Sequence, residues 1–465
     1  MPRAARFAAA LLGVTIGLVA VVPPATAGDT SPDDPVFQQG LQWGLERIGA
    51  PGAWARGTGD GITIAIVDSG VDLNHEDLKG KVVAQVSCVG ADGDAARCQG
   101  SAQDDNGHGS HVAGIALAST DNGRGIAGVA PDANLMAVRV LTNECDSTGC
   151  SAAGSAADVV AGIRWAADHG ADVINLSLGG GALQGALGCG FCDAVEYAWS
   201  KGAIPVVAAG NDSGLPSGFG DEHAVVVTAT TRDDQRASYS SSSSGLLRVA
   251  RWPVAAPGGE GESAASDCAT GGTPKGVISS HWVPGGSNKY ACLAGTSMAA
   301  PHVAGALAVL RGLGHSPQSA IDQLLATARD LGPPGRDDQY GVGRVDLGRA
   351  VGAATVTTTA SSSTTNNNNT TTTTTSGAPP SSEAALTSTT AAPPSTAPGE
   401  TTTAPTVQVP TPPEAAAPFT LTPTPGSSGA TEGPSPWIVV LAVAALLASG
   451  AGAAVTAWRL RRAGP

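Results

Sequence analysis

The sequence predicts an α/β domain with a mostly parallel β-sheet flanked by helices, and three observations support this fold class. Apolar runs of strand length recur without polar alternation, which indicates strands that are covered on both faces. Segments of helical character separate these runs. The pattern stops near residue 352, where a Thr-, Ser- and Pro-rich tract begins. The expected strands are 62–67, 135–140, 173–176, 204–208 and 224–228, and the expected helices are 111–118, 155–169, 193–201, 296–310 and 316–328.

Residues 1–27 are expected to be a secretory signal peptide. Two arginines precede the apolar run 7–22, and Ala-Thr-Ala at 25–27 provides a small-residue cleavage site. An uncleaved N-terminal anchor is the alternative. Residues 28–45 then form an N-terminal extension in front of a globular domain at 46–352. We therefore expect this domain to be exported.

The segment 437–458 predicts a single C-terminal transmembrane helix. It contains no charged residue, has Trp at both ends, and is long enough, at ~1.5 Å per residue, to cross a ~30 Å hydrocarbon core. Three arginines follow in the tail 459–465, and positive residues stay cytoplasmic. A buried core helix is the alternative. The prediction is a single-pass protein of the cell membrane whose globular domain is extracellular.

The tract 353–436 is expected to be a disordered linker between the domain and this helix. It consists mainly of Thr, Ser, Pro and Ala, with few charges and few large apolar residues. Burial of apolar surface therefore cannot compensate for the conformational entropy that ordering would remove. Its length suits a stalk that carries the domain away from a membrane.

The charge balance excludes nucleic acid as a partner. The chain has 25 Lys+Arg against 39 Asp+Glu, a formal net charge of −14. Neutralising phosphates requires lysines and arginines in patches, and the sequence contains no basic cluster of that kind.

Three short segments of the domain carry residues that can do chemistry. Asp68 directly follows the predicted strand 62–67, His108 lies in Asn-Gly-His-Gly-Ser-His-Val-Ala-Gly (106–114), and Ser297 lies in Gly-Thr-Ser-Met-Ala-Ala-Pro-His-Val-Ala-Gly (295–305). Reactive groups of parallel sheets collect at the carboxyl ends of the strands. A hydroxyl nucleophile needs a base within hydrogen-bond reach, and the base needs a third group that fixes its tautomer. The three residues can fill these roles.

Together these segments resemble the three motifs of the subtilisin-like serine protease family, the subtilases, in which the chain order is also Asp, His, Ser. The resemblance covers residues 39–347, and the visible departure in the motifs is Ser110, where Thr is more usual. It implies a subtilisin-like fold and a serine endopeptidase that hydrolyses peptide bonds of proteins through an acyl-enzyme.

The resemblance also assigns roles to individual residues. Asp68 orients the base His108, and Ser297 is the nucleophile. Asn211, at the end of Ala-Ala-Gly-Asn (208–211), supplies the amide that binds the oxyanion. The segment Ile-Asn-Leu-Ser-Leu-Gly-Gly (174–180) binds extended polypeptide substrates by strand addition, through Ser177, Leu178 and Gly179.

A structural Ca²⁺ site is a further implication of the resemblance, because hard cations take oxygen ligands from flexible loops. The site joins an N-terminal Gln, an Asp after the catalytic Asp and the loop 120–126; Asp77 and Asn122 are expected to supply side chains and the loop to supply carbonyls. The alternative is a plain turn rich in Asx residues. The expected ligands are Gln39, Asp77 and Asn122, with carbonyls from Thr120, Arg124 and Ile126.

Eight cysteines lie between residues 88 and 292, and an even count in an exported domain predicts disulfides. Cross-pairing between the 145–150 and 189–192 loops stays open, as does a redox or zinc role for the Cys-x-x-Cys at 189–192. Proximity in sequence favours the pairs Cys88–Cys98, Cys145–Cys150, Cys189–Cys192 and Cys268–Cys292.

The order of segments resembles that of mycosins, the anchored proteases associated with type VII secretion in actinobacteria. Only about 40 residues separate the predicted cleavage site from Asp68, too few for a separate folding prodomain. This resemblance implies a processing protease with a secretion-system partner. The alternative function is a catalytically silent, membrane-tethered scaffold or adhesin.

A carboxyl protease that uses paired acids is the competing chemistry. Asp104 and Asp105 stand just before the His108 motif and are the candidate pair. We expect both to be solvated loop residues instead.

Overall fold

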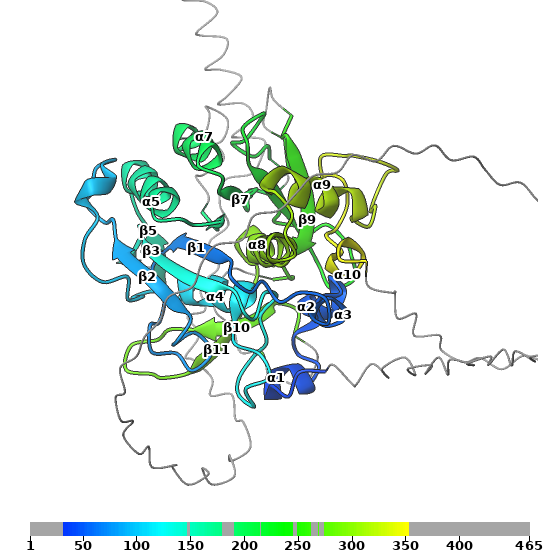
Figure 1. Cartoon of the computed structure of the whole chain (residues 1–465), viewed down its shortest axis with the longest axis horizontal. Helices are drawn as coiled ribbons and strands as arrows, with labels where there is room; N and C mark the ends of the chain where they lie inside the picture. The colour runs from blue at the N-terminus through cyan, green and yellow to red at the C-terminus, as the bar shows by residue number, and fades with distance from the viewer. Residues whose placement is uncertain are drawn as a thin grey trace, which may run out of the picture. The chain divides into compact units, whose positions relative to one another are not determined.

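A parallel β-sheet of seven strands organises the described part of the chain (Figure 1). The computed structural model describes residues 31–352 except 147–148, 179–189, 214, 245–248, 262–267 and 269–273. The strand order is β2-β3-β1-β6-β7-β8-β9, and each neighbouring pair is parallel. The strands are β1 (Thr63–Asp68), β2 (Val82–Ser87), β3 (Asn134–Arg139), β6 (Val173–Leu176), β7 (Ile204–Ala208), β8 (Val225–Thr230) and β9 (Trp252–Pro257).

Strand β1 is the point at which the order of the strands reverses. From β1 the chain builds β2 and β3 on one side, and then crosses to β6 and the later strands on the other side. In open parallel sheets, ligands bind at the carboxyl ends of the strands beside such a switch point. Asp68 is the last residue of β1 and therefore lies at this position.

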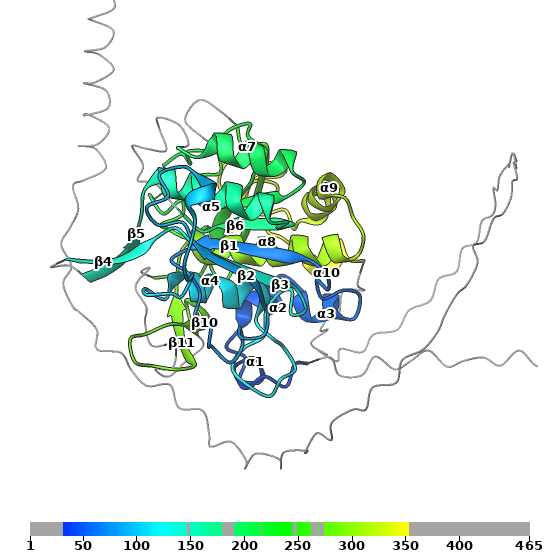
Figure 2. The same ribbon diagram turned by 60° about the vertical axis from the view of Figure 1, so that its left-hand side comes forward.

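Helices cover both faces of the sheet, as the continuous apolar runs predict (Figures 1 and 2). Alternate residues of β1 enter two different cores. Ile64 and Ile66 pack with side chains of α4 and α8, whereas Ala65 and Val67 pack with side chains of α5 and α7. These helices are α4 (His108–Leu117), α5 (Ala156–Asp168), α7 (Cys192–Ser200) and α8 (Thr296–Gly312).

The predicted N-terminal extension is part of the core rather than a separate segment. Phe37, Trp43 and Leu45 are buried in the same cluster as Ile64. The backbone N–H of Val36 donates to the carbonyl of Gly125, at 2.9 Å. The short helices of this region and of the C-terminal end are α1 (Pro35–Gln38), α2 (Trp43–Arg47), α3 (Ala50–Trp54), α9 (Pro317–Thr327) and α10 (Leu347–Ala350).

Several elements were not predicted. Strand β2 lies at the edge of the sheet and mixes buried and exposed residues, so it lacks a continuous apolar run. Two antiparallel ribbons were also missed: β4 (Thr142–Asp146) with β5 (Gly149–Ala153), and β10 (Val277–His281) with β11 (Lys289–Leu293). The β4–β5 ribbon extends away from the sheet in Figure 2. The 3₁₀ helix η1 (Ala95–Arg97) was not predicted either.

Three of the four favoured disulfides are confirmed. Cys145–Cys150 joins opposite residues of the β4–β5 ribbon, which rules out cross-pairing of those two cysteines with the 189–192 loop. Cys192 is also disulfide-bonded, and its predicted partner Cys189 lies outside the described residues. The confirmed pairs are Cys88–Cys98, Cys145–Cys150 and Cys268–Cys292.

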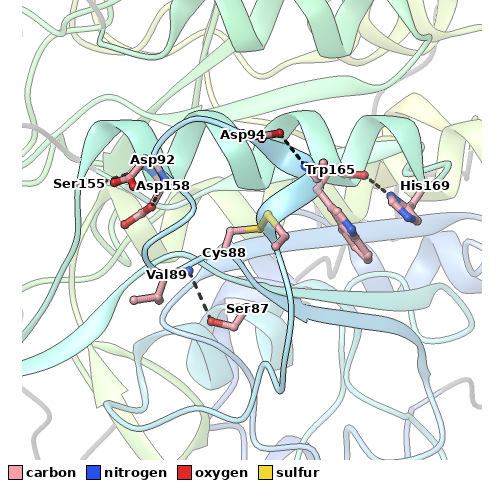
Figure 3. Close-up of a disulfide and its surroundings, with 11 residues drawn as sticks. Ser87, Cys88, Val89, Asp92, Asp94, Ser155, Asp158, Trp165 and His169 are labelled. Atoms are coloured by element: carbon pink, nitrogen blue, oxygen red, sulfur yellow. Dashed lines mark hydrogen bonds between the residues drawn. A yellow bond between two sulfur atoms is a disulfide. The ribbon is translucent and has the colours of Figure 1, made fainter.

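The Cys88–Cys98 disulfide closes a loop that packs on helix α5 (Figure 3). Trp165 of α5 lies beside the disulfide. Asp158, in the first turn of α5, accepts a hydrogen bond from the backbone N–H of Asp92 at 3.1 Å. A buried carboxylate thus holds this loop against the start of a helix.

The predicted signal peptide, linker and transmembrane helix lie outside the described residues. Within the part of the chain that the structure describes, no helix is both long enough and apolar enough to cross a membrane.

Candidate active site

Asp68, His108 and Ser297 each stand at the end or the beginning of a regular element. Asp68 ends β1, His108 begins α4, and Ser297 is the second residue of α8. Helix α4 packs against α8, and both pack against the sheet. The fold therefore brings three residues that are far apart in sequence to the same edge of the sheet.

A short hydrogen bond joins the aspartate to the histidine. The distance from His108 Nδ1 to Asp68 Oδ1 is 2.8 Å, and the side chain of Asp68 is fully buried. The backbone N–H of Ser69 donates to the same oxygen at 2.7 Å. Because a carboxylate only accepts, Nδ1 carries the proton, and Nε2 is left to act as a base.

Opposing effects act on the pKa of His108. Burial lowers this pKa, whereas the charge of Asp68, the hydrogen bond with Asp68 and the charge of Asp104 raise it. The net result is a pKa above the ordinary value for histidine. His111 Nε2, one turn further along α4, donates to the carbonyl of Ala291, and burial holds the pKa of His111 well below the usual range.

The hydroxyl of Ser297 is hydrogen-bonded to the substrate-binding segment in this structure. Ser297 Oγ donates to the carbonyl of Ser177 at 3.2 Å, and Ser177 Oγ donates to the carbonyl of Ser297 at 2.7 Å. Attack requires the Ser297 hydroxyl to leave Ser177 and turn to His108. Catalytic hydrogen bonds of this kind often tighten only when substrate is bound.

Asn211 is held with its amide nitrogen free to donate. Its Oδ1 accepts from the backbone N–H of Thr296 at 2.9 Å and from the Thr296 hydroxyl at 3.0 Å. Thr296 Oγ1 in turn accepts from the backbone N–H of Gly210 at 3.1 Å. A side chain at Gly295 would place its Cβ 3.3 Å from Asn211 Nδ2. Glycine at this position therefore keeps the donor accessible, as an oxyanion site requires.

The predicted substrate-binding residues follow strand β6. Ser177 and Leu178 come directly after the strand and are almost completely buried. Gly179 lies outside the described residues. The contacts of Ser177 with Ser297 place this segment next to the nucleophile.

The predicted calcium ligands are only partly brought together. Asp77 Oδ1 accepts from Asn122 Nδ2 at 3.2 Å, and its Oδ2 accepts from the backbone N–H of Ile126 at 3.2 Å. The loop 120–126 closes around them: Thr120 Oγ1 accepts from Gly128 N, and the N–H of Arg124 donates to Asn122 Oδ1. The exposed side chain of Gln39, in contrast, donates to the carbonyl of Pro35.

Asp34 occupies the place expected for Gln39. It is fully buried, and it accepts from the backbone N–H groups of Asp121 and Asn122 at 2.9 and 3.4 Å. Asp34 is thus an additional candidate ligand, and Gln39 stays a prediction. The sequence signal for Asp34, an acidic residue before Pro35, is that of an ordinary helix N-terminus.

Two buried carboxylates near this loop lack a cationic partner. Burial raises the pKa of Asp77 to about 7 and that of Asp34 to about 6, although hydrogen bonds counteract it. No lysine or arginine among the described residues forms an ion pair with either one. The Asp33, Asp34 and Asp121 carboxylates also offer oxygens within 4.8 Å of one another. This all-oxygen donor set fits a hard divalent cation.

The expectation of a solvated Asp104 is wrong. Asp104 is 1% exposed, whereas its neighbour Asp105 is partly exposed and pairs with Arg139. Asp104 accepts five hydrogen bonds from the Asp68 and His108 loops, because the chain turns back on itself there. Burial of this kind depends on packing between segments that are distant in sequence. It therefore produces no local sequence pattern from which it could be predicted.

Comparisons with known proteins agree with this geometry. The sequence model of the Subtilase family matches residues 59–343. Thermitase from Thermoactinomyces vulgaris is 38% identical over 325 residues, which cover 69% of this chain and 99% of thermitase. Subtilisin Savinase from Lederbergia lenta is 36% identical over 276 residues, which cover 59% of this chain and 85% of Savinase. A solved protease structure from Pseudoalteromonas arctica PAMC 21717 matches with a TM-score of 0.54 and 31% identity. The match covers 69% of this chain and 98% of that protease chain.

Asn211→Ala is expected to lower kcat by roughly 10²- to 10³-fold with little change in KM, because the amide donor acts on the oxyanion of the transition state. Steady-state kinetics with a peptide substrate measure this. Asn211→Asp is the matched variant, since it keeps the Oδ1 acceptor for Thr296 but replaces the donor. A loss in Asn211→Ala that Asn211→Asp does not share would contradict the oxyanion role.

The pH dependence follows from the His108–Asp68 pair. Attack requires neutral His108, and its pKa lies above the ordinary ~6.5. The protonated, inactive form therefore persists to a higher pH than in free histidine. We expect kcat/KM to rise through this pKa and to reach a plateau at neutral to alkaline pH. A maximum at acidic pH would instead favour the carboxyl-protease alternative.

Proposed function

Since this chain belongs to the subtilase family, and is thus a serine endopeptidase, we propose that it is a membrane-anchored enzyme that cuts polypeptides outside the cytoplasm. The observation that carries the catalytic part is the 2.8 Å bond between His108 and buried Asp68, at the same sheet edge as Ser297 and Asn211. A protein that only binds a partner has no need of this combination.

Each step of peptide hydrolysis can be assigned to a residue of this chain. His108 Nε2 takes the proton of Ser297 Oγ as this oxygen attacks the substrate carbonyl, and Asp68 stabilises the imidazolium that forms. Asn211 Nδ2 donates to the oxyanion of the tetrahedral intermediate. His108 then protonates the leaving amine, which leaves an acyl group on Ser297. Water, activated by His108, releases the acyl group by the same steps.

Extended polypeptides are the substrates, as the relationship to proteases implies. The segment 177–178 lies against Ser297 and follows a strand of the central sheet. We propose that its backbone pairs with the substrate as an added strand, which recognises any extended peptide.

The export and anchoring of the enzyme are proposed from the sequence. The apolar segment 437–458 with its following arginines supports a membrane anchor with the catalytic domain outside. The three disulfides support an oxidising compartment. A mycosin-like processing role with a secretion-system partner is consistent with an N-terminal segment that packs into the core and with a C-terminal anchor.

We further propose that a structural Ca²⁺ binds beside the loop 120–126. Asp34, Asp77 and Asn122 would supply side-chain oxygens, with the carbonyls of Thr120, Arg124 and Ile126. The ion would supply positive charge to two buried carboxylates. The bound ion would connect the N-terminal segment to the loop that follows α4.

Labelling with a fluorophosphonate tests the enzyme and its location together. We expect the full-length chain to be labelled in the membrane fraction, and Ser297→Ala to abolish labelling because the nucleophile is lost. A chain truncated after residue 436 should be labelled in the medium instead. An unlabelled full-length chain would favour the silent scaffold or adhesin, and labelled truncated protein that stays in the membrane would contradict the anchor.

Removal of calcium with a chelator is expected to lower the midpoint of thermal unfolding. Asp77→Asn should lower the midpoint in the presence of calcium and remove most of the response to chelator, because a buried ligand is lost. Asp60→Asn, at an exposed aspartate, is the matched control and should respond as the unmodified protein does. An unmodified protein whose midpoint does not change with chelator contradicts the site.

A further inference from the structure

Asp104 is a buried carboxylate beside the catalytic pair with no assigned role in the reaction. Its Oδ1 accepts from Ser69 Oγ at 2.9 Å and from the backbone N–H groups of Asn106 and Gly107, both at 3.0 Å. Its Oδ2 accepts from the N–H and the hydroxyl of Ser110, at 3.0 and 2.6 Å. All five partners donate, an arrangement that favours the ionised carboxylate, whereas burial raises the pKa of Asp104.

These hydrogen bonds join two separate segments of the active site. Ser69 follows the catalytic aspartate, and its backbone N–H donates to Asp68 Oδ1. The Ser69 hydroxyl also accepts from the N–H of Gly109, directly after His108, at 3.0 Å. On the other side, Asp104 binds the N–H groups immediately before and two residues after His108. The carboxylate therefore connects the loop of Asp68 with the first turn of α4.

The backbones of these two segments pack against each other with no side chain between them at Gly109. A Cβ at Gly109 would lie 2.0 Å from the carbonyl oxygen of Gly70 and 3.1 Å from Asp68 Cβ. The two backbones thus touch directly, and their spacing is determined by hydrogen bonds such as those of Asp104. A displacement of about 1 Å between catalytic groups can cost 10²-fold in rate.

We propose that Asp104 is a positioning residue for catalysis, because its carboxylate fixes the Asp68 loop relative to the start of the His108 helix. It thereby sets the geometry of the His108–Asp68 hydrogen bond. The proposal rests on the triad function given above, and it adds to the triad one buried residue, Asp104, that acts through Asp68 and His108 rather than on the substrate.

The charge of Asp104 also acts on His108. The ionisable groups that face His108 are Asp68, Asp104, His111 and His281. Burial lowers the pKa of both other histidines, that of His281 to about 4, so they are neutral at the pH of activity. Asp68 and Asp104 are thus the charged groups that favour protonated His108 among the described residues. Loss of the Asp104 charge should lower the pKa of His108.

Asp104→Asn in the full-length chain tests this proposal. We expect kcat to fall roughly 10- to 100-fold with KM changed less than about twofold, because geometry rather than substrate binding is disturbed. The acid limb of the kcat/KM profile should move to lower pH. Titration with a fluorophosphonate counts folded active sites, so that kcat is expressed per site.

Asp158→Asn is the matched control. Asp158 is likewise a buried carboxylate that holds a loop to the first turn of a helix, but it lies on α5 and is not among the charges that act on His108 (Figure 3). It should affect kcat less than about twofold, whatever it does to thermal stability. If Asp104→Asn likewise changes only stability, with normal kcat per site and an unchanged acid limb, Asp104 is a structural cap and the proposal is wrong.

Ser69→Ala provides the test if Asp104→Asn does not fold. It removes two hydrogen bonds of the connection, from Ser69 Oγ to Asp104 and from the N–H of Gly109 to Ser69 Oγ, but leaves the charge of Asp104. We expect kcat to fall roughly 2- to 10-fold, with an acid limb that does not move. A normal kcat in Ser69→Ala would overturn the proposal. Failure of the unmodified chain to react with the fluorophosphonate would instead contradict the proposed function itself.

Discussion

The burial of the Asp68 carboxylate is the constraint on which the rest of the active site depends. A buried charge is costly unless it is paired and hydrogen-bonded. Here the pairing comes from His108 Nδ1 and the backbone N–H of Ser69. Both partners exist only because β1 ends at the switch point of a parallel sheet, and because α4 begins against the loop that follows β1. The need to satisfy one carboxylate therefore couples the end of a strand to the start of a helix.

The sheet makes this arrangement rigid. Successive residues of β1 enter cores on opposite faces, so the strand that carries Asp68 is held from both sides. Helix α8 packs against the same face as α4, which gives Ser297 a fixed place relative to His108. The nucleophile itself keeps one freedom, the direction of its hydroxyl, which bonds to Ser177 here. A rigid backbone with a single rotating hydroxyl suits a reaction in which substrate binding completes the hydrogen bonds.

Local sequence patterns lead to Asp68, His108, Ser297 and Asn211 as candidate catalytic residues, but not to the groups that support them. Asp68, His108 and Ser297 stand in short motifs whose neighbours are small residues, so family resemblance identifies them directly. The support of these residues comes from contacts between segments far apart in sequence. Examples are the hydrogen bond that Asn211 Oδ1 accepts from Thr296 and the burial of Asp104. Asp34 was not singled out beside Gln39 for the same reason. The two residues lie five positions apart, and only the docking of the N-terminal segment on the 120–126 loop buries Asp34 and leaves Gln39 exposed. Strand β2 and the two ribbons escaped prediction because edge and antiparallel strands lack continuous apolar runs.

The buried carboxylates of this domain are stabilised in different ways, and the differences follow from what lies next to each one. Asp68 faces an imidazole that can become positive during the reaction, so its charge is used when the imidazolium forms. Asp104 accepts five hydrogen bonds, which favour its ionised form and oppose the rise in pKa that burial causes. Asp34 has two backbone donors, and Asp77 has three donors that include the hydroxyl of Tyr290. Burial raises the pKa of Asp34 to about 6 and that of Asp77 to about 7, so hydrogen bonds alone leave both carboxyls harder to ionise than an ordinary aspartate. A bound cation would favour the ionised form of both, and it would connect the N-terminal segment of the domain to the loop 120–126.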